Sequence, residues 1–343
     1  MNIPESLYWR NNELYLLDQR LLPAQEEYIR QSGIEDVWCS INTLAVRGAP
    51  AIGIAAAYGS LTGLHKNFSL SAEDFGNKYI SQAEYLITSR PTAVNLSYTL
   101  NIMINVCRKS VADSAEKLYT ELEAQASALH NEDIEMNRMI GVYGAELISN
   151  GCRILTHCNA GAMASTGIGT ALAPVYTAHK KGIKLSVYAD ETRPLLQGAR
   201  ITVWELMKAG VETTLVCDNM AADLMSRGMV DLVIVGCDRV AANGDTANKI
   251  GTHTLAVTAR HFGIPFYIAA PSSSIDQKTV NGAGIIIEQR AQEEVTAFGV
   301  CITAPDGVKV YNPSFDVTPN SLITGFITEK GRITPPYDFS GGV

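Results

Sequence analysis

The chain has 343 residues, of which 46% are hydrophobic and 18% charged, a composition typical of a globular protein with about two domains. Its formal net charge of -8 provides no basic field for nucleic acid or anionic lipid, so any phosphate must be bound locally. The first residues do not form a secretory signal, and no run approaches the ~18 apolar residues of a membrane span. We therefore expect a cytoplasmic protein.

Cysteine and histidine spacing gives no sign of a metal or disulfide framework. The 7 cysteines are widely spaced without a C-x-x-C pair, and the 6 histidines are scattered. A metal site assembled from distant residues is the alternative that spacing cannot test. We expect no metal and no cofactor.

Residues 33–150 show the spacing of amphipathic helices. Pro50 and Pro91 stand where a first helical turn would begin, a position that tolerates proline because its missing N–H would be unpaired anyway. The pattern predicts a mainly helical N-terminal domain over residues 1–150. Apolar side chains recur at intervals of three and four at Phe75, Tyr79, Ala83 and Leu86, and again at Leu96, Leu100, Met103 and Cys107.

After Asn150, short apolar runs alternate with helical stretches. This alternation predicts a parallel sheet with crossover helices, and so an α/β domain over residues 151–343. A proline-rich C-terminal stretch predicts loops around one short helix near Pro319 to Thr328. The apolar runs are Arg153 to Thr156, Lys184 to Ala189, Thr213 to Cys217, Asp231 to Gly236 and Pro265 to Ala270.

Several of these runs end in polar or reactive residues. In open parallel sheets, ligands bind beyond the carboxyl ends of the strands, so we expect these residues to face one crevice. They are His157-Cys158-Asn159, Asp190-Glu191, Asp218-Asn219 and Cys237-Asp238.

Two arginines precede predicted helices. Arg47 is followed by Gly48 and Ala49 at the start of an alanine-rich run, and Arg90 directly precedes Pro91. The N–H groups at a helix start favour an anion, and a guanidinium can add a forked pair of charged hydrogen bonds. The alternative, which these residues alone favour, is tight helix packing in the first block and a surface helix boundary in the second.

Cys158 follows a predicted strand and leads into a loop of small residues and a helix, whose N–H groups can favour a thiolate. His157 is poorly placed to activate it, because adjacent side chains on a strand point to opposite faces. A buried structural cysteine is the alternative. Gly167 and Gly169, with Asp190 at the next strand end, keep an NAD-binding interpretation open, although the third glycine of that fingerprint is missing.

Asp238 follows the most apolar of the runs. A half-buried carboxyl group there would have a raised pKa and could act as a general acid, whereas a salt bridge to Arg239 or a loop cap is the alternative. Asn248 and Lys249 are predicted at the start of the next helix. Gln197 opens another helix and could donate to a phosphate or a sugar hydroxyl.

These blocks resemble methylthioribose-1-phosphate isomerases over nearly the whole chain. The resemblance implies a helical N-terminal domain joined to a Rossmann-like domain, a homodimer, and a small phosphorylated sugar as substrate. It also implies catalysis by Cys158 and Asp238, with substrate contacts from Arg47, Gly48, Ala49, Arg90, Gln197, Asn248 and Lys249. The matching blocks are VRGAPAIGIAAAYG, RPTAVNL, HCNAGA, DETRPLLQGARIT, GCDRVAANGDTANKIGT and VYNPSFDVTP.

The resemblance leaves other functions open. Regulatory subunits of the translation-initiation guanine-nucleotide exchange factor share the fold and are not isomerases, but Cys158, Asp238 and the arginines favour an enzyme. Close enzymatic relatives act on 5-deoxyribose 1-phosphate or ribose 1,5-bisphosphate. We expect conversion of 5-methylthioribose 1-phosphate to 5-methylthioribulose 1-phosphate, in methionine salvage.

Overall fold

The computed structural model describes residues 2–90 and 94–341. By their contacts, the residues form two compact units. The helical unit comprises Pro4–Glu135 and Ala162–Gly169, and the sheet unit comprises Met1–Ile3, Met136–Gly161 and Thr170–Val343. The domain boundary expected at residue 150 stays a prediction.

The helical unit begins with a three-stranded antiparallel sheet that the sequence analysis did not predict. β1 (Leu7–Arg10) and β2 (Glu13–Leu17) form a hairpin at Asn11 and Asn12, whose φ angles of 54° and 61° suit a two-residue turn. β3 (Tyr28–Gln31) pairs with β2. The helical pattern is confirmed by α1 (Ile34–Asn42), α2 (Ala49–Gly59), the 3-10 turn η1 (Leu64–Asn67), α3 (Ala72–Ile87), α4 (Val94–Lys109) and α5 (Ala115–Ala145).

Helix α2 is the centre of this unit. Residues 51–59 are all buried, so the helix is covered on every side. A β-carbon on Gly53 would come within 2.7 Å of Thr99 Oγ1, which shows how closely α4 approaches. The tight packing suggested by the sequence is therefore present. The helix start predicted at Pro50 is confirmed, whereas the one predicted at Pro91 lies outside the described residues.

The sheet unit is built on a seven-stranded sheet with the order β16-β15-β10-β7-β4-β5-β6. All neighbouring strands are parallel except β16, which is antiparallel to β15 at one edge. Without β16 this is the strand order of a Rossmann fold, so the predicted fold class is confirmed. The strands are β4 (Cys152–Thr156), β5 (Leu185–Asp190), β6 (Glu212–Val216), β7 (Leu232–Val235), β10 (Phe266–Ala269), β15 (Gly325–Thr328) and β16 (Gly331–Ile333).

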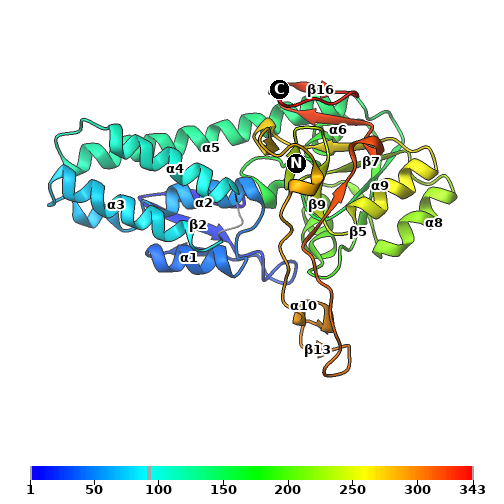
Figure 1. Cartoon of the computed structure of the whole chain (residues 1–343), viewed down its shortest axis with the longest axis horizontal. Helices are drawn as coiled ribbons and strands as arrows, with labels where there is room; N and C mark the ends of the chain where they lie inside the picture. Colours follow the sequence, from blue (N-terminus) through cyan, green and yellow to red (C-terminus); the bar gives the residue numbers. More distant parts are fainter. Residues whose placement is uncertain (1, 91–93, 342–343) are drawn as a thin grey trace. The chain divides into compact units, whose positions relative to one another are not determined.

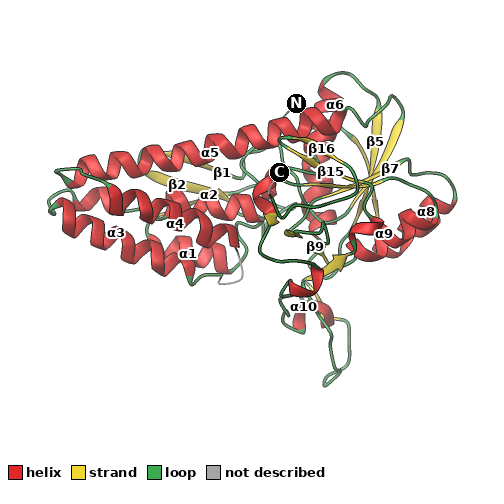
Figure 2. Ribbon diagram, turned by 45° about the horizontal axis from the view of Figure 1, so that its top comes forward, coloured by secondary structure: helices red, strands yellow, loops and turns green. Residues whose placement is uncertain are grey.

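Crossover helices cover this sheet, as Figures 1 and 2 show. On one side, Met225 of α8 (Ala221–Ser226) and Leu255 of α9 (Thr252–His261) are buried in one apolar cluster with Val233 and Phe266 of the strands. Apolar burial of this kind stabilises the fold by about 25 cal/mol per Å² removed from water. The helices and turns are η2 (Ala162–Ala164, in the helical unit), α6 (Ala173–Lys180), the π-turn η3 (Gly198–Thr202), α7 (Val203–Lys208), η4 (Asp218–Met220), α8 (Ala221–Ser226) and α9 (Thr252–His261).

The strand order reverses between β4 and β7. The chain runs outward from β4 through β5 to β6, and then returns to place β7 on the other side of β4. At such a switch point the loops after the two central strands diverge and leave a crevice where ligands bind. Cys158 follows β4 and Asp238 follows β7, so the topology brings both predicted catalytic residues to this point of the sheet.

A smaller four-stranded sheet adjoins the loop after β7, with the order β11-β8-β9-β14. Its strands are β11 (Ile275–Asp276), β8 (Arg239–Ala241), β9 (Thr246–Lys249) and β14 (Phe315–Thr318). The helix predicted near Pro319 to Thr328 is wrong. Only the 3-10 turn η7 (Asn320–Leu322) is helical there, and the apolar residues from Gly325 join the main sheet as β15, where β10 supplies their backbone partners.

Residues 285–313 form an arm that leaves the sheet unit between β11 and β14 (Figure 1). The arm contains α10 (Glu293–Thr296) and a hairpin of β12 (Ala297–Phe298) and β13 (Cys301–Ile302), and it follows the turns η5 (Ser272–Ser274) and η6 (Gly282–Gly284). Arg193 anchors the arm, since its Nη2 donates to the Val295 carbonyl at 3.1 Å and its guanidinium lies 5.7 Å from the Phe298 ring centroid. Among the described residues, no helix is both long and apolar enough to span a bilayer.

Candidate active site

Cys158 has a backbone conformation that is unusual for cysteine. Its φ of 62° lies in the left-handed region, which costs a residue with a β-carbon about 1 to 2 kcal/mol. Its N–H donates to Thr192 Oγ1 at 2.8 Å, and its carbonyl accepts from Thr202 Oγ1 at 2.6 Å. The residue is only 9% exposed. Strain held in place by two hydroxyl groups is typical of functional positions rather than of a cysteine that only fills space.

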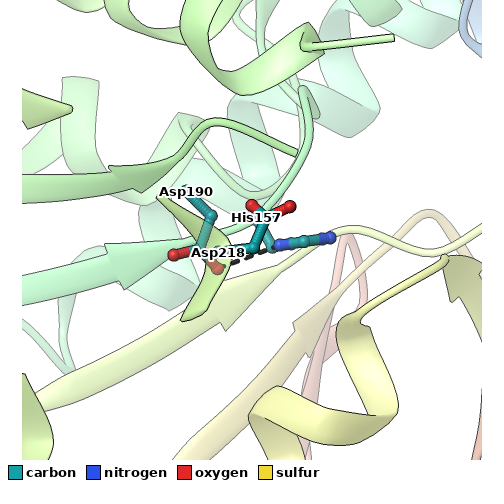
Figure 3. A group of neighbouring side chains, drawn as sticks. All are labelled: His157, Asp190 and Asp218. Atoms are coloured by element: carbon teal, nitrogen blue, oxygen red, sulfur yellow. Dashed lines mark hydrogen bonds and ion pairs between the residues drawn. The ribbon is translucent and has the colours of Figure 1, made fainter. Parts of the chain in front are cut away.

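His157 faces a different set of groups (Figure 3). Its Nδ1 lies 2.9 Å from Asp190 Oδ2, and its Nε2 lies 2.8 Å from the carbonyl oxygen of Ile250. Because both ring nitrogens are engaged, His157 is not available as a base for Cys158, and the Cys-His dyad is excluded. Asp190 is buried, with its Oδ2 held by His157, so it lacks the exposure that the NAD-binding interpretation requires of a ribose-binding acid.

Asp238 is exposed, which differs from the half-buried carboxyl group that we expected. The physical reason is its place in the turn between β7 and β8, beyond the end of the main sheet, where its N–H donates to the Ala247 carbonyl at 2.9 Å. Arg239, the partner considered in the sequence analysis, lies 3.6 Å from Asp276 through its Nη1. The role of Asp238 as a general acid stays a prediction.

Asn248 and Lys249 lie on β9, four and three residues before the first residue of α9, and not at the helix start that we predicted. The chain pairs with β14 here, so backbone hydrogen bonds hold the segment extended before the helix begins. The Asn248 side chain is buried and its Nδ2 donates to Thr252 Oγ1 at 2.9 Å. Lys249 Nζ lies 4.9 Å from the centroid of the Phe315 ring, a cation-π contact.

Gln197 is buried directly before the π-turn η3, and π-turns occur frequently at functional sites. Its side-chain Oε1 has no hydrogen-bond partner among the described residues, which is rare for a buried amide. The next residue, Gly198, approaches β5 so closely that a β-carbon would lie 1.7 Å from the Asp190 carbonyl oxygen. Gln197 is thus fixed beside the carboxyl end of β5.

Arg47, Gly48, Ala49 and Arg90 all belong to the helical unit. Gly48 caps α2 with a φ of 87°, and a β-carbon there would lie 2.4 Å from Ala164, so only glycine fits. Arg47 and Ala49 flank it, half-buried, and Arg90 is half-buried after the end of α3. The first three are consecutive residues at the start of α2, and the assignment of all four to substrate stays a prediction.

A cluster of possible metal ligands lies near Cys158. One ligand atom each from His157, Asp190 and Asp218 lie within 4.8 Å of one another. However, both nitrogens of His157 are engaged, and the two carboxylate oxygens of Asp218 accept from the N–H groups of Thr192 at 2.7 Å and Arg193 at 2.8 Å. The cluster is thus largely hydrogen-bonded internally, although the buried Asp190 Oδ1 has no hydrogen-bond partner among the described residues. The expectation of no metal stays a prediction.

Comparison with known proteins shows the family to which the chain belongs. A model described as the "Initiation factor 2 subunit family" matches residues 45–335. The chain belongs to the initiation factor 2 subunit family. Within it, the chain is 50% identical over 332 residues to a methylthioribose-1-phosphate isomerase from Desulforamulus reducens, with 97% of this chain and 96% of the relative covered.

Two further members bear on function. A protein named 5-deoxyribose 1-phosphate isomerase from Petrotoga mobilis is 48% identical, with 98% of this chain and 96% of the relative covered. The crystal structure of 5-methylthioribose 1-phosphate isomerase from Pyrococcus horikoshii OT3 superposes with a TM-score of 0.93 at 43% identity, covering 98% of this chain and 94% of that one. The resemblance stated from the sequence is thus confirmed.

Proposed function

We propose that the chain is an aldose-ketose isomerase that converts 5-methylthioribose 1-phosphate to 5-methylthioribulose 1-phosphate without metal or nucleotide cofactor. The observation that carries this proposal is the placement of Cys158 and Asp238 after the two strands of the switch point, in a chain 50% identical to a relative named for that reaction. We infer further that the enzyme is a cytoplasmic homodimer that serves methionine salvage.

The proposed chemistry starts from a locked sugar, because a phosphate on the anomeric oxygen prevents spontaneous ring opening. Asp238 protonates the ring oxygen while the bond from C1 to that oxygen breaks. Hydrogen then moves from C2 to C1, the 2-hydroxyl loses its proton, and the open-chain ketose results. Cys158 stabilises developing charge or carries a proton. The hydrogen can move from C2 to C1 as a hydride or through an enediol, and the atoms and electrons balance in both routes.

Substrate binding is assigned to Arg47, Gly48, Ala49, Arg90, Gln197, Asn248 and Lys249. The cations among them hold the phosphate, with the N–H groups at the start of α2 as further donors. The unpartnered Gln197 Oε1 supports a role as acceptor for a sugar hydroxyl. Replacing Arg47 or Arg90 with lysine removes the planar guanidinium that can make a forked pair of hydrogen bonds to the phosphate. We expect a loss of about 1.5 to 3 kcal/mol of transition-state binding, measured as a decrease in kcat/KM.

The test is a substrate panel with purified protein, scored by formation of ketose 1-phosphate. We expect 5-methylthioribose 1-phosphate to be used well and ribose 1,5-bisphosphate poorly, because a second phosphate would lose hydration without gaining partners. A higher kcat/KM for 5-deoxyribose 1-phosphate would favour the function named for the Petrotoga relative. Absence of turnover with all three sugars would favour a regulatory module of the same fold.

A further inference from the structure

The side chain of His157 links two parts of the sheet unit that are far apart in sequence. It is 1% exposed, and it lies between Asp190 at the end of β5 and Ile250 after β9. Figure 3 shows its contact with Asp190. A carbonyl oxygen can only accept, so Nε2 must carry a proton and donate to Ile250. A carboxylate also only accepts, so Nδ1 carries the second proton. With Asp190 ionised, both ring nitrogens donate and His157 is a buried imidazolium.

The surroundings of His157 support that charge. Asp190 contacts it directly, Asp218 lies in the same cluster, and the charge of Asp316 also acts on it. Burial alone lowers the pKa of His157, but the hydrogen bond and charge of Asp190 outweigh burial, so the pKa lies above its usual value. The imidazolium is thus the cation of this cluster.

The ring also supports the backbone beyond Ile250. Gly251 has a φ of 105°, and a β-carbon there would lie 2.8 Å from His157 Cε1, so the ring packs directly against this residue. On the other side, Asp316 accepts from the Gly251 N–H at 2.7 Å and from the His253 N–H at 3.1 Å. The turn between β9 and α9 is therefore held between an imidazolium and a carboxylate.

This turn begins directly after the two residues assigned to substrate. Lys249 precedes Ile250, and the Lys249 carbonyl accepts from Thr252 Oγ1 at 2.7 Å. The same hydroxyl accepts from Asn248 Nδ2 at 2.9 Å. A shift of the turn at Ile250 would thus move both side chains, although the hydrogen bonds of the His157 ring go to Asp190 and Ile250.

We propose that His157 is a positioning residue that fixes Asn248 and Lys249 for substrate through its Nε2 hydrogen bond to Ile250. This inference rests on the proposed function for the role of Asn248 and Lys249, but the contact itself does not. The sequence alone does not indicate this positioning role, because His157 directly precedes Cys158 and is more readily interpreted as the base for that thiol.

Two substitutions separate the contacts of the ring. In His157→Gln, the amide nitrogen stands where Nε2 stood and can donate to Ile250. In His157→Asn, the amide nitrogen stands where Nδ1 stood and can donate only to Asp190. We expect KM to stay within about threefold of wild type for the glutamine variant and to rise tenfold or more for the asparagine variant. Equal KM values in the two variants would overturn the proposal, whatever their melting temperatures.

A second readout does not depend on turnover. Hydrogen exchange of the peptide that spans residues 246–256 should accelerate in His157→Asn and stay near wild type in His157→Gln. If the wild-type protein isomerises none of the sugars, this measurement still tests the contact, so failure of the proposed function is distinguishable. If hydrogen exchange of this peptide is unchanged in His157→Asn, His157 does not stabilise the turn and the proposal is wrong. His261→Asn, at the exposed end of α9, is the matched control and should change neither KM nor exchange.

If His157→Asn does not fold, Asp190→Asn tests the same contact. The neutral amide can donate to Nδ1 while Nε2 keeps its proton and its bond to Ile250, so we expect a KM within about threefold of wild type. A tenfold rise in KM without loss of thermal stability would show that the charge, and not the contact with Ile250, does the positioning. That result would also overturn the proposal.

Discussion

The Thr192 hydroxyl accepts a hydrogen bond of 2.8 Å from the N–H of Cys158, and so stabilises the left-handed backbone conformation of that cysteine. Thr192 is itself left-handed, with a φ of 66°, and its N–H is bound by Asp218. The conformation of the loop after β4, which carries Cys158, therefore depends on the loop after β5.

We predict that Thr192→Val lowers kcat about tenfold or more, because the buried N–H of Cys158 loses its acceptor and the strained conformation loses its support. Thr192→Ser keeps the hydroxyl and should stay within about threefold of wild type. Steady-state kinetics of both variants check this. Equal kcat in the valine and serine variants would show that the hydroxyl does not matter.

Asp238→Asn should abolish turnover while substrate still binds, because the amide keeps the shape of the side chain but cannot supply a proton. Binding is measured by calorimetry under conditions where turnover is absent. Asp223→Asn, which removes an exposed carboxylate paired with Arg227 on α8, is the control and should be fully active. Near-normal kcat in Asp238→Asn would end its assignment as the acid.

Substitutions of Cys158 should separate function from stability. Alanine normally stabilises a chain relative to glycine by about 0.5 to 1 kcal/mol, but at a φ of 62° the order should reverse. We predict that Cys158→Gly is more stable than Cys158→Ala in urea unfolding, and that both are inactive. A fully active alanine variant would mean that Cys158 is a buried structural cysteine after all.

The raised pKa of His157 predicts a pH dependence of stability. Below the unfolded-state pKa of about 6.5, His157 is protonated in both the folded and the unfolded state, and its contribution to the free energy of unfolding is fully present. As pH rises through the higher folded-state pKa, the native state loses its proton and this stabilisation is lost. The free energy of unfolding of wild type should therefore fall, relative to His157→Gln, as pH increases above about 6.5. Parallel curves for the two proteins would contradict an imidazolium.

Much of the sheet unit could be predicted from sequence, because strands such as β4, β5 and β7 are short, mainly apolar runs that are followed by polar residues. The N-terminal hairpin was missed although Asn11 and Asn12 give a turn signal, since the flanking strands are short and half-exposed. β15 was mistaken for a helix because four residues, Gly325–Thr328, carry no periodicity, and only pairing with β10 makes them a strand.

Within the site, the predictable part was the identity of residues at strand ends. Their supports could not be predicted, because Thr192 and Thr202 lie 34 and 44 residues from Cys158 and act through its backbone. The exposure of Asp238 was also hidden, since an apolar run gives no indication of how far beyond the sheet the next residue lies.

The arm of residues 285–313 offers positions where the polypeptide can be cut while its two fragments stay associated. Gly299 and Gly307 lie on it, both exposed and both with positive φ, where a protease can fit a loop into its active site. A cut at either glycine separates the last strands from the rest of the polypeptide, yet β14 stays paired with β9 and β15 stays paired with β10. The two fragments would then copurify as one particle, and separately expressed halves split at this arm could be used to reconstitute the enzyme.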